Sequence, residues 1–320
     1  MRPLWHGGDI WNFYAYQIVR RILKKERPDV VHIHNARGLS LSTFRAVKSL
    51  DLPLVLTAHD YSLVCPRYSL LKVSGEICRS PLPICRVVNR VKKLLVDNKP
   101  DVVTAPSQFV IDKLRETGLF NNSRSLRLFN AIGLDGARPA RKNYETIDIL
   151  YSGQLTKVKG VHILISAFKQ INCKNIRLHI AGRGNYAERL KEIADGDSRI
   201  TFHGFMEWEE LKGLYEKASV TVVPSIWYEP FGLIMIESFK YGTPVIGSNI
   251  GGIPEIVEDG YNGLLFEAGN VNQLKDKLAS LIDNPLELER LSQGAFESAK
   301  KFDINNHIAQ LENMYEQVVK

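Results

Sequence analysis

The sequence lacks long apolar runs. No stretch of its 320 residues approaches the roughly 18 consecutive apolar residues that a membrane-spanning helix needs, so we predict no such helix. The amino terminus, MRPLWHGGD, lacks the charged-then-apolar layout of a secretory signal. Hydrophobic residues make up 44% and charged residues 24%, an ordinary composition for a globular chain. We therefore expect a cytoplasmic protein whose length suffices for two domains.

Cysteine is scarce and unevenly placed. Three of the four cysteines, Cys65, Cys78 and Cys85, share one segment, and Cys173 lies far along the chain. The intervals of 12 and 6 intervening residues match no close-paired zinc pattern, and a fourth nearby thiol is missing. A disulfide is not expected in a reducing cytoplasm. Two interpretations stay open: free thiols in a loop, or a metal clip completed by a histidine.

Acidic residues are few in the first half. Residues 1–145 hold 24 Lys and Arg against 12 Asp and Glu, a net of +12, whereas the remainder holds 18 against 23, a net of −5. A basic half favours an acidic partner such as anionic lipid or nucleic acid, although a solvated basic face is the alternative. Because aromatic residues do not alternate with the basic ones and no reader motif is present, we expect no nucleic acid partner.

Histidines mark the ends of two predicted strands in this half. His32 and His34 are two residues apart on a strand over residues 29–34, so they share one face. No cysteine or carboxylate nearby completes a ligand set, and packing or site lining is favoured over a metal. The next strand, over residues 54–58, ends at His59 and Asp60.

The stretch over residues 218–266 is the centre of the chain. Val220–Val223 is a β-branched run typical of a buried strand, and a short loop follows it. We predict a helix from Phe231 to about Tyr241. Glu229 lies in the loop, at the carboxyl end of the strand where open α/β sheets bind ligands, and Glu237 lies two turns into the helix.

Backbone groups between the two glutamates suit an anion. A helix that starts here leaves its first N–H groups, at Phe231, Gly232 and Leu233, without partners inside the helix, and such groups bind phosphate. An anion held between two hydroxyl-binding carboxylates describes a nucleotide sugar. The alternative is a loop glutamate and a solvated helix glutamate with no shared role.

A second phosphate-binding arrangement precedes this stretch. The predicted strand over residues 147–151 runs into S-G-Q-L-T-K-V-K-G and then a helix from Val161, which is a strand, a glycine-bearing loop and a helix. Two further predicted strands, over residues 177–181 and 200–203, end at glycines.

These motifs together carry a family resemblance. The strings E-P-F-G-L-I-M-I-E, Y-G-T-P-V-I and G-G-I-P-E-I-V-E-D-G-Y-N-G-L-L resemble the donor-binding half of retaining glycosyltransferase family 4, and the resemblance covers nearly the whole chain. It implies the α/β fold called GT-B, with two Rossmann-like doubly wound domains facing across a cleft. It also implies retaining sugar transfer with no cofactor and no essential metal, the nucleotide sugar being a co-substrate.

The resemblance assigns roles residue by residue. Catalysis is expected from His59, Glu229 and Lys159. The family usually has an arginine where this chain has Gln154, so stabilisation of the leaving diphosphate would depend more on Lys159, and on Lys157 if it turns inward. The expected donor-binding residues are Gly153, Gln154, Lys159, Gly182, Phe205, Glu229, Phe231, Gly232, Leu233 and Glu237.

The resemblance also divides the chain. We expect an acceptor-side domain over residues 1–140, a donor-binding domain over 141–303 and a final helix over 304–320 that crosses back to the first domain. Family members normally begin with a strand, a glycine-rich loop and a helix. This chain starts after them, so the first domain is expected to be N-terminally truncated, with four strands against six in the second.

We therefore expect a hexosyltransferase that uses a UDP- or GDP-linked sugar and a glycan or lipid-linked acceptor, in surface polysaccharide or glycoconjugate synthesis. Contact with the anionic inner face of the membrane through the basic first domain is part of this expectation. The alternatives are a non-catalytic nucleotide-sugar-binding subunit, a truncated inactive transferase, or a sugar-nucleotide epimerase of the same fold.

Overall fold

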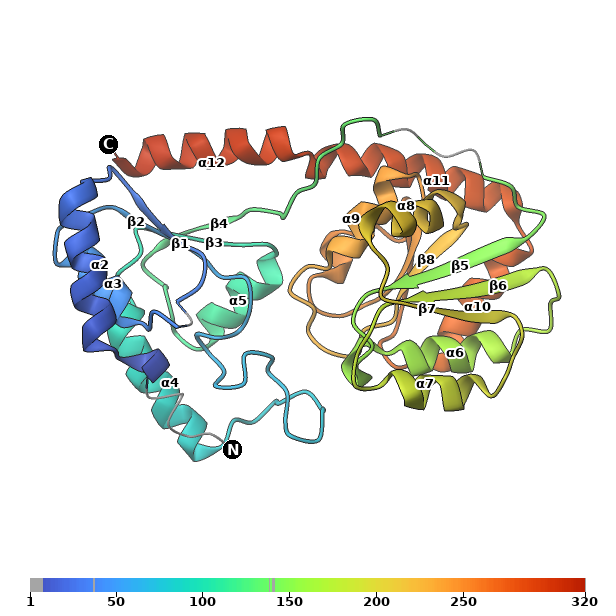
Figure 1. Ribbon diagram of the computed structural model, residues 1–320, viewed down its shortest axis with the longest axis horizontal. Coiled ribbons are helices and arrows are strands. Elements are labelled where there is room, and N and C mark those ends of the chain that lie inside the picture. Colours follow the sequence, from blue (N-terminus) through green and yellow to red (C-terminus); the bar gives the residue numbers. More distant parts are fainter. Residues whose placement is uncertain (1–7, 37, 138, 140–141, 320) are drawn as a thin grey trace. The chain divides into compact units, whose positions relative to one another are not determined.

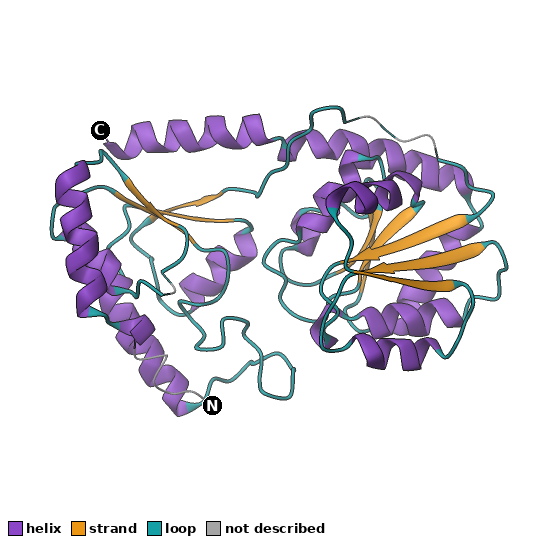
Figure 2. Cartoon of the chain, in the orientation of Figure 1, coloured by secondary structure: helices purple, strands orange, loops and turns teal. Residues whose placement is uncertain are grey.

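The computed structural model describes residues 8–36, 38–137, 139 and 142–319 (Figure 1). These residues form two compact units. Unit 1 comprises residues 8–129 together with 307–319, and unit 2 comprises residues 130–306. Each unit is built on a parallel sheet with helices around it, which confirms the predicted α/β class (Figure 2). Among the described residues, no helix has both the length and the apolar character needed to cross a bilayer.

Unit 1 contains a four-stranded sheet in the order β1-β2-β3-β4. Its strands are β1 (Val31–Ile33), β2 (Leu54–Thr57), β3 (Val102–Ala105) and β4 (Arg124–Arg127). Its helices are α2 (Phe13–Glu26), α3 (Ser42–Lys48), α4 (Pro83–Val96), α5 (Gln108–Glu116) and α12 (Ile304–Val319). The expectation that this unit lacks an initial strand and a glycine-rich loop stays a prediction.

Helix α12 completes the core of unit 1 from the far end of the sequence. Met314 is buried against Val55 of β2 and Val102 of β3. The Tyr315 hydroxyl lies 2.7 Å from Nδ1 of His32, which follows the first residue of β1. The last helix is therefore part of the first unit's fold. Helix α4, by contrast, lies in the segment that follows the first cysteine, where the sequence pattern did not indicate a helix.

Unit 2 contains a six-stranded sheet in the order β10-β9-β8-β5-β6-β7. Its strands are β5 (Ile147–Ser152), β6 (Ile176–Ala181), β7 (Ile200–Gly204), β8 (Val220–Val223), β9 (Val245–Ser248) and β10 (Gly263–Phe266). Strand β6 pairs with one side of β5, and β7 lies beyond β6. Strand β8 pairs with the other side of β5. The point between β5 and β8 is where the strand order reverses, the place at which doubly wound sheets bind ligands.

Helices cover both faces of this sheet. They are α6 (Val161–Lys169), α7 (Ala187–Ala194), α8 (Trp208–Lys217), α9 (Leu233–Lys240), α10 (Val271–Ile282) and α11 (Pro285–Ala299). In Figure 1, α6, α7 and α10 lie on one face of the sheet and α8, α9 and α11 on the other. Because both faces of the sheet are covered, every residue of β5 and β8 is buried, with no alternation of buried and exposed positions.

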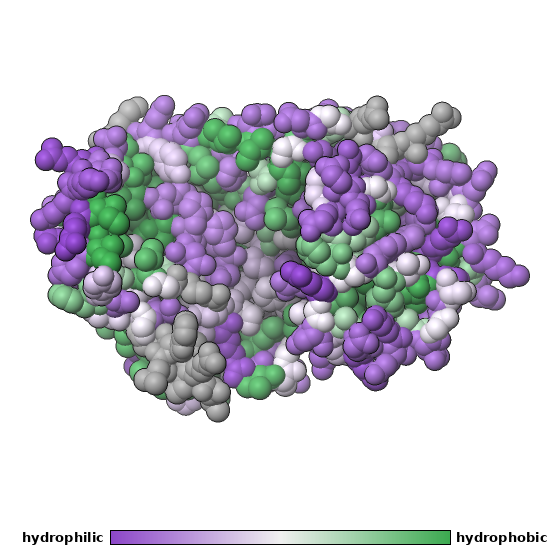
Figure 3. Space-filling model, viewed as in Figure 1, coloured by the Kyte–Doolittle hydropathy of each residue, from purple (hydrophilic) through white to green (hydrophobic). Residues whose placement is uncertain are grey.

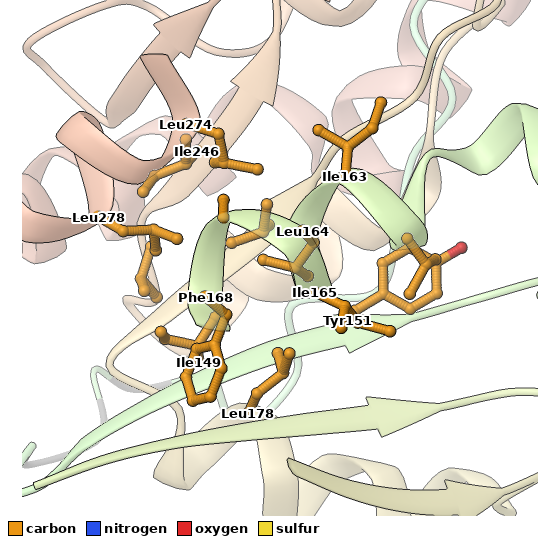
Figure 4. Close-up of a cluster of buried hydrophobic side chains, with 14 of the residues drawn as sticks. Ile149, Tyr151, Ile163, Leu164, Ile165, Phe168, Leu178, Ile246, Leu274 and Leu278 are labelled. Atoms are coloured by element: carbon orange, nitrogen blue, oxygen red, sulfur yellow. The ribbon is translucent and has the colours of Figure 1, made fainter. Parts of the chain in front are cut away.

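The core of unit 2 lies between the sheet and helices α6 and α10 (Figure 4). Ile149 and Leu178 project from neighbouring strands onto Phe168 of α6, and all three side chains are fully buried. Each such side chain contributes about 1.5–3 kcal/mol relative to an exposed position. This packing holds the strand ends, and the loops that leave them, in place.

The start of α9 differs from the prediction. The helix begins at Leu233, two residues after Phe231, because Gly232 has φ +101°, outside the helical region. A side chain at Gly232 would also place its Cβ 2.9 Å from Cε of Met235. Glu237 is consequently the fifth residue of the helix and lies one turn from its start, not two.

Candidate active site

Two loops meet at the switch point of the unit 2 sheet. One connects β5 to α6 and the other connects β8 to α9. The backbone N–H of Ile226 in the second donates to the carbonyl of Val158 in the first, at 2.9 Å. Gly160 has φ +72°, and a Cβ there would lie 1.8 Å from the carbonyl oxygen of Pro224. Only glycine allows this approach, which brings the side chains of the two loops together.

The charged centre of this junction is an ion pair. Nζ of Lys159 lies 2.7 Å from Oε2 of Glu229, and the two side chains are 23% and 10% exposed. The same oxygen accepts from Ser225 Oγ at 3.1 Å and from Trp227 Nε1 at 3.0 Å. Within the described part of the chain, none of these three donors reaches Oε1. The carboxylate is therefore held by one oxygen, which leaves the other for a ligand.

An aromatic ring also lies beside the ion pair. The Lys159 ammonium lies 5.3 Å from the centre of the Trp227 ring, a cation–π distance. The backbone carbonyl of Glu229 accepts from Gly252 at 2.7 Å, so the loop is fixed from a second direction. A pre-positioned lysine and carboxylate can hold a phosphate oxygen and a sugar hydroxyl without reorganising at the moment of reaction.

A cavity of about 390 Å³ opens at the carboxyl ends of β5 and β6. Its volume is in the range of small-molecule sites. Predicted donor-binding residues form a large part of its wall: Gly153, Gln154, Gly182, Phe205 and Glu237. The other lining residues are Ser152, Ala181, Arg183, Met206, Leu211 and Ile234.

The floor of this cavity is made of backbone. The N–H of Gly153 donates to the carbonyl of Ala181 at 3.0 Å, and the N–H of Gly182 donates to the carbonyl of Gly204. Gly182 has φ +142°, and a Cβ there would lie 1.8 Å from the carbonyl oxygen of Gly153. Only glycine at position 182 allows the ends of β5 and β6 to approach this closely.

Arg183 and Phe205 form one wall. The guanidinium carbon of Arg183 lies 4.5 Å from the centre of the Phe205 ring. Phe205 is 57% exposed, so part of its surface remains available for stacking. Arg183 was not among the residues predicted from the sequence, because a single arginine between two glycines resembles an ordinary turn.

Glu237 ends a chain of buried hydroxyl groups. The Tyr215 hydroxyl donates to Oε2 of Glu237 at 2.9 Å and lies 2.7 Å from Ser152 Oγ. Burial raises the pKa of Glu237 above its ordinary value, and the Tyr215 hydrogen bond partly opposes that shift. Burial also raises the pKa of Tyr215 well above its usual range, so this hydroxyl keeps its proton and acts as a donor. Sequence reasoning missed Tyr215 because an aromatic residue on a helix resembles an ordinary core residue.

The start of α9 lies between the two glutamates in sequence. Phe231 is 2% exposed and its ring packs edge-on against Phe302, with 6.1 Å between centres. Its side chain is therefore structural, and any contact with a ligand would come from the backbone. Leu233 is 45% exposed at the first helical position, beside Gly232. The N–H of Met235 donates to the carbonyl of Gly232 at 3.2 Å. The N–H groups of Leu233 and Ile234, which precede it, have no acceptor inside an α-helix, and such groups suit a phosphate.

His59 lies in unit 1, at the end of β2, in a histidine cluster. Its Nε2 lies 2.9 Å from Nδ1 of His34, and the ring centre of His34 lies 4.0 Å from that of His32, with the two ring planes tilted by 33°. The carboxylate of Asp60 accepts from the Ser62 backbone N–H at 2.7 Å. The side-chain hydrogen-bond partner that the structure gives His59 is therefore His34.

The histidine cluster makes the stability of unit 1 sensitive to acid. Burial is the main cause that lowers the pKa values of His32, His34 and His59. The pKa of His32 falls from 6.5 to about 4. Between those two values the unfolded chain binds more protons than the folded one, so stability decreases as pH falls through this window and is flat above it. We expect the Tm to decline from pH 6.5 towards pH 4. A His32→Gln variant should show a shallower decline in calorimetry, and an identical pH profile would contradict this origin.

Potential metal ligands do not gather in the described residues: they contain no group of three or more His, Cys, Asp or Glu side chains that could hold an ion. Cys65, Cys78, Cys85 and Cys173 are free thiols.

Comparison with known proteins agrees with this geometry. Residues 137–298 match the family Glycosyl transferases group 1, and residues 1–132 match Glycosyltransferase Family 4. An uncharacterized glycosyltransferase of Methanocaldococcus jannaschii is 27% identical over 95% of this chain and 80% of its own length. Glycogen synthase of Mycobacterium tuberculosis is 32% identical over 84% of this chain and 64% of its own length.

Solved structures show the same fold. The structure of HepE from Anabaena in complex with UDP superimposes with a TM-score of 0.77 at 19% identity, over 94% of this chain and 82% of that one. The match to Glycosyl transferases group 1 extends over half of the chain and includes both loops of the junction and every residue that lines the cavity. The chain belongs to the group 1 glycosyltransferases of family 4, GT-B enzymes that transfer sugar from a nucleotide-sugar donor.

Proposed function

We propose that this protein is a retaining hexosyltransferase. It moves a hexose from a UDP- or GDP-linked donor to a hydroxyl of a glycan or lipid-linked acceptor in surface polysaccharide or glycoconjugate synthesis. The observation that carries the donor assignment is the adjacency, at one sheet edge, of the glycine-floored cavity and the Lys159–Glu229 pair. A uridine nucleotide is favoured because HepE, with the same fold, has been solved with UDP.

In this proposal the cavity holds the nucleoside. The base stacks on the Arg183–Phe205 wall above Gly153 and Gly182, and Gln154 lines the same cavity. Glu237, oriented by Tyr215, accepts from the ribose diol. The diphosphate lies between Lys159 and the first-turn backbone of α9, around Phe231, Gly232 and Leu233, where positive charge stabilises the leaving group.

Glu229 and His59 act on the sugar. Glu229 binds sugar hydroxyls through Oε1, while Oε2 keeps its protein donors. We do not assign Glu229 as a covalent nucleophile, because front-face attack guided by the leaving phosphate suits this family better. Lowering of its pKa keeps His59 neutral at pH 7, so it acts as a hydrogen-bonding group rather than a cation. Unit 1 is assigned to the acceptor and unit 2 to the donor.

The test is calorimetric titration of UDP, GDP and ADP into the full chain, followed by release of nucleotide from each sugar conjugate. Saturable binding of one nucleotide, with its sugar conjugate consumed only when an acceptor is present, is the expected result. Binding without consumption would favour the non-catalytic subunit. Conversion of the donor without acceptor would favour the epimerase. Absence of binding for all three nucleotides would remove the proposed donor site.

A further inference from the structure

Helix α4 presents its apolar side chains to solvent. Ile84, Val87, Val91 and Leu94 are 65%, 55%, 39% and 75% exposed. Their spacings of three, four and three residues place them on one stripe of the helix. Leu82, which precedes the helix, is 64% exposed as well. Single exposed apolar residues are common, but a continuous stripe of them marks an interaction surface.

The inward face of the same helix is the more polar one. Asn89 donates through Nδ2 to the carbonyl of Val64, and Lys92 donates through Nζ to the carbonyl of Ser62. Lys92 and Val96 are the buried residues of this helix. Among the described residues of unit 1, the stripe therefore contributes little to the core, and their packing does not explain its apolar character.

Positive charge borders the stripe. At 3.6 residues per turn, Arg86 and Arg90 lie on the flank next to Leu94, and both are exposed. The helix, Pro83–Val96, contains no aspartate or glutamate. An apolar stripe with cations along its edge is the pattern of a helix that lies in the plane of an anionic membrane surface.

Helix α2 and the residues before it also expose hydrophobic side chains. Helix α3 contacts both α2 and α4, and a cavity lined by Trp11, Tyr16, Leu95 and Lys99 lies where the three come together. Large hydrophobic residues are exposed in and beside α2 too: Trp11, Phe13, Tyr14 and Ile22. Figure 3 shows hydrophobic and hydrophilic surface side by side over α2 and its neighbours. Tryptophan and tyrosine favour the headgroup level of a bilayer.

We propose that the apolar stripe of α4 docks unit 1 on an anionic lipid bilayer. The stripe enters the interface, and Arg86 and Arg90 contact lipid phosphates. A second copy of the chain fits less well, because a two-fold interface through this face would oppose the same cations from each copy. This surface is independent of the donor site and would operate whichever nucleotide the enzyme uses. Docking would bring the acceptor-side unit to lipid-linked acceptors.

The test is co-sedimentation of the full chain with vesicles of phosphatidylcholine alone and of phosphatidylcholine with phosphatidylglycerol. Wild type should bind the anionic vesicles, and added salt should weaken the binding. An Ile84→Ser/Leu94→Ser variant should bind the anionic vesicles at least about tenfold more weakly than wild type. An Arg86→Ala/Arg90→Ala variant should lose the preference for anionic vesicles. The matched control is Leu286→Ser, since Leu286 is 78% exposed on α11 of unit 2 and should not affect binding.

Circular dichroism and nucleotide titration establish that each variant is folded. Equal binding by wild type and the α4 variants would overturn the proposal, as would equal binding to the two kinds of vesicle. Failure of the wild-type chain to bind anionic vesicles would overturn it too. Self-association that the serine substitutions abolish, measured by analytical ultracentrifugation, would assign the stripe to a second copy instead.

Discussion

Replacement of Lys159 by methionine should lower kcat by about 10²–10³-fold, the usual cost of removing one preorganised group that stabilises developing charge. The ammonium lies 2.7 Å from Glu229, at the edge proposed for the diphosphate. The variant should also lower the free energy of unfolding by about 2–4 kcal/mol, because a carboxylate that is 10% exposed loses its charged partner. Steady-state kinetics and denaturant unfolding measure the two effects separately.

A double variant distinguishes the effect of Lys159→Met on turnover from its effect on stability. Lys159→Met/Glu229→Gln removes both charges, so stability should return towards wild type while turnover stays low. The exposed pair of Lys191 and Glu188, 2.9 Å apart and 54% and 83% exposed, supplies a matched control. Lys191→Met should change stability by less than about 1 kcal/mol and leave turnover unchanged. Normal turnover in Lys159→Met would refute its role at the leaving group.

Replacement of Glu237 by alanine should weaken nucleotide binding by about 10–100-fold, the usual value of hydrogen bonds to a charged group. The carboxylate lines the cavity and is oriented by Tyr215. Because burial raises the pKa of Glu237, the wild-type affinity should decrease as the pH is lowered, and at a higher pH than for an exposed glutamate. Calorimetric titration at several pH values measures both the loss and its pH dependence.

Companion variants locate the effect. Tyr215→Phe keeps the ring but removes the donor to Glu237, so it should give an intermediate loss of affinity. Glu188→Ala, on the exposed side of α7, should bind nucleotide like wild type. Unchanged affinity in Glu237→Ala would remove the ribose assignment while leaving the Lys159 prediction intact.

Local pattern was sufficient for the succession of strands along the chain and for the position of the main loops, although it did not indicate helix α4. The β-branched run at Val220–Val223 is a strand with the predicted bounds, since strand periodicity and flanking proline are both local signals. The start of α5 follows a local signal too, since the side chain of Ser107, the residue before the helix, accepts from the N–H of Val110. The start of α9 was misplaced because the conformation of Gly232 depends on its neighbours.

The sequence by itself determined that this chain has two α/β halves, that glycine-bearing loops follow its strands, and that Lys159, Glu229 and Glu237 are its site candidates. It could do so because apolar periodicity, glycine and proline act over a few residues. Tertiary structure alone decided that Lys159 and Glu229, 70 positions apart, form one ion pair on a single carboxylate oxygen. It also decided that Tyr215 orients Glu237 and that the apolar stripe of α4 faces outward. The physical reason is that strand order and helix orientation set these contacts, and neither is written in any local stretch of residues.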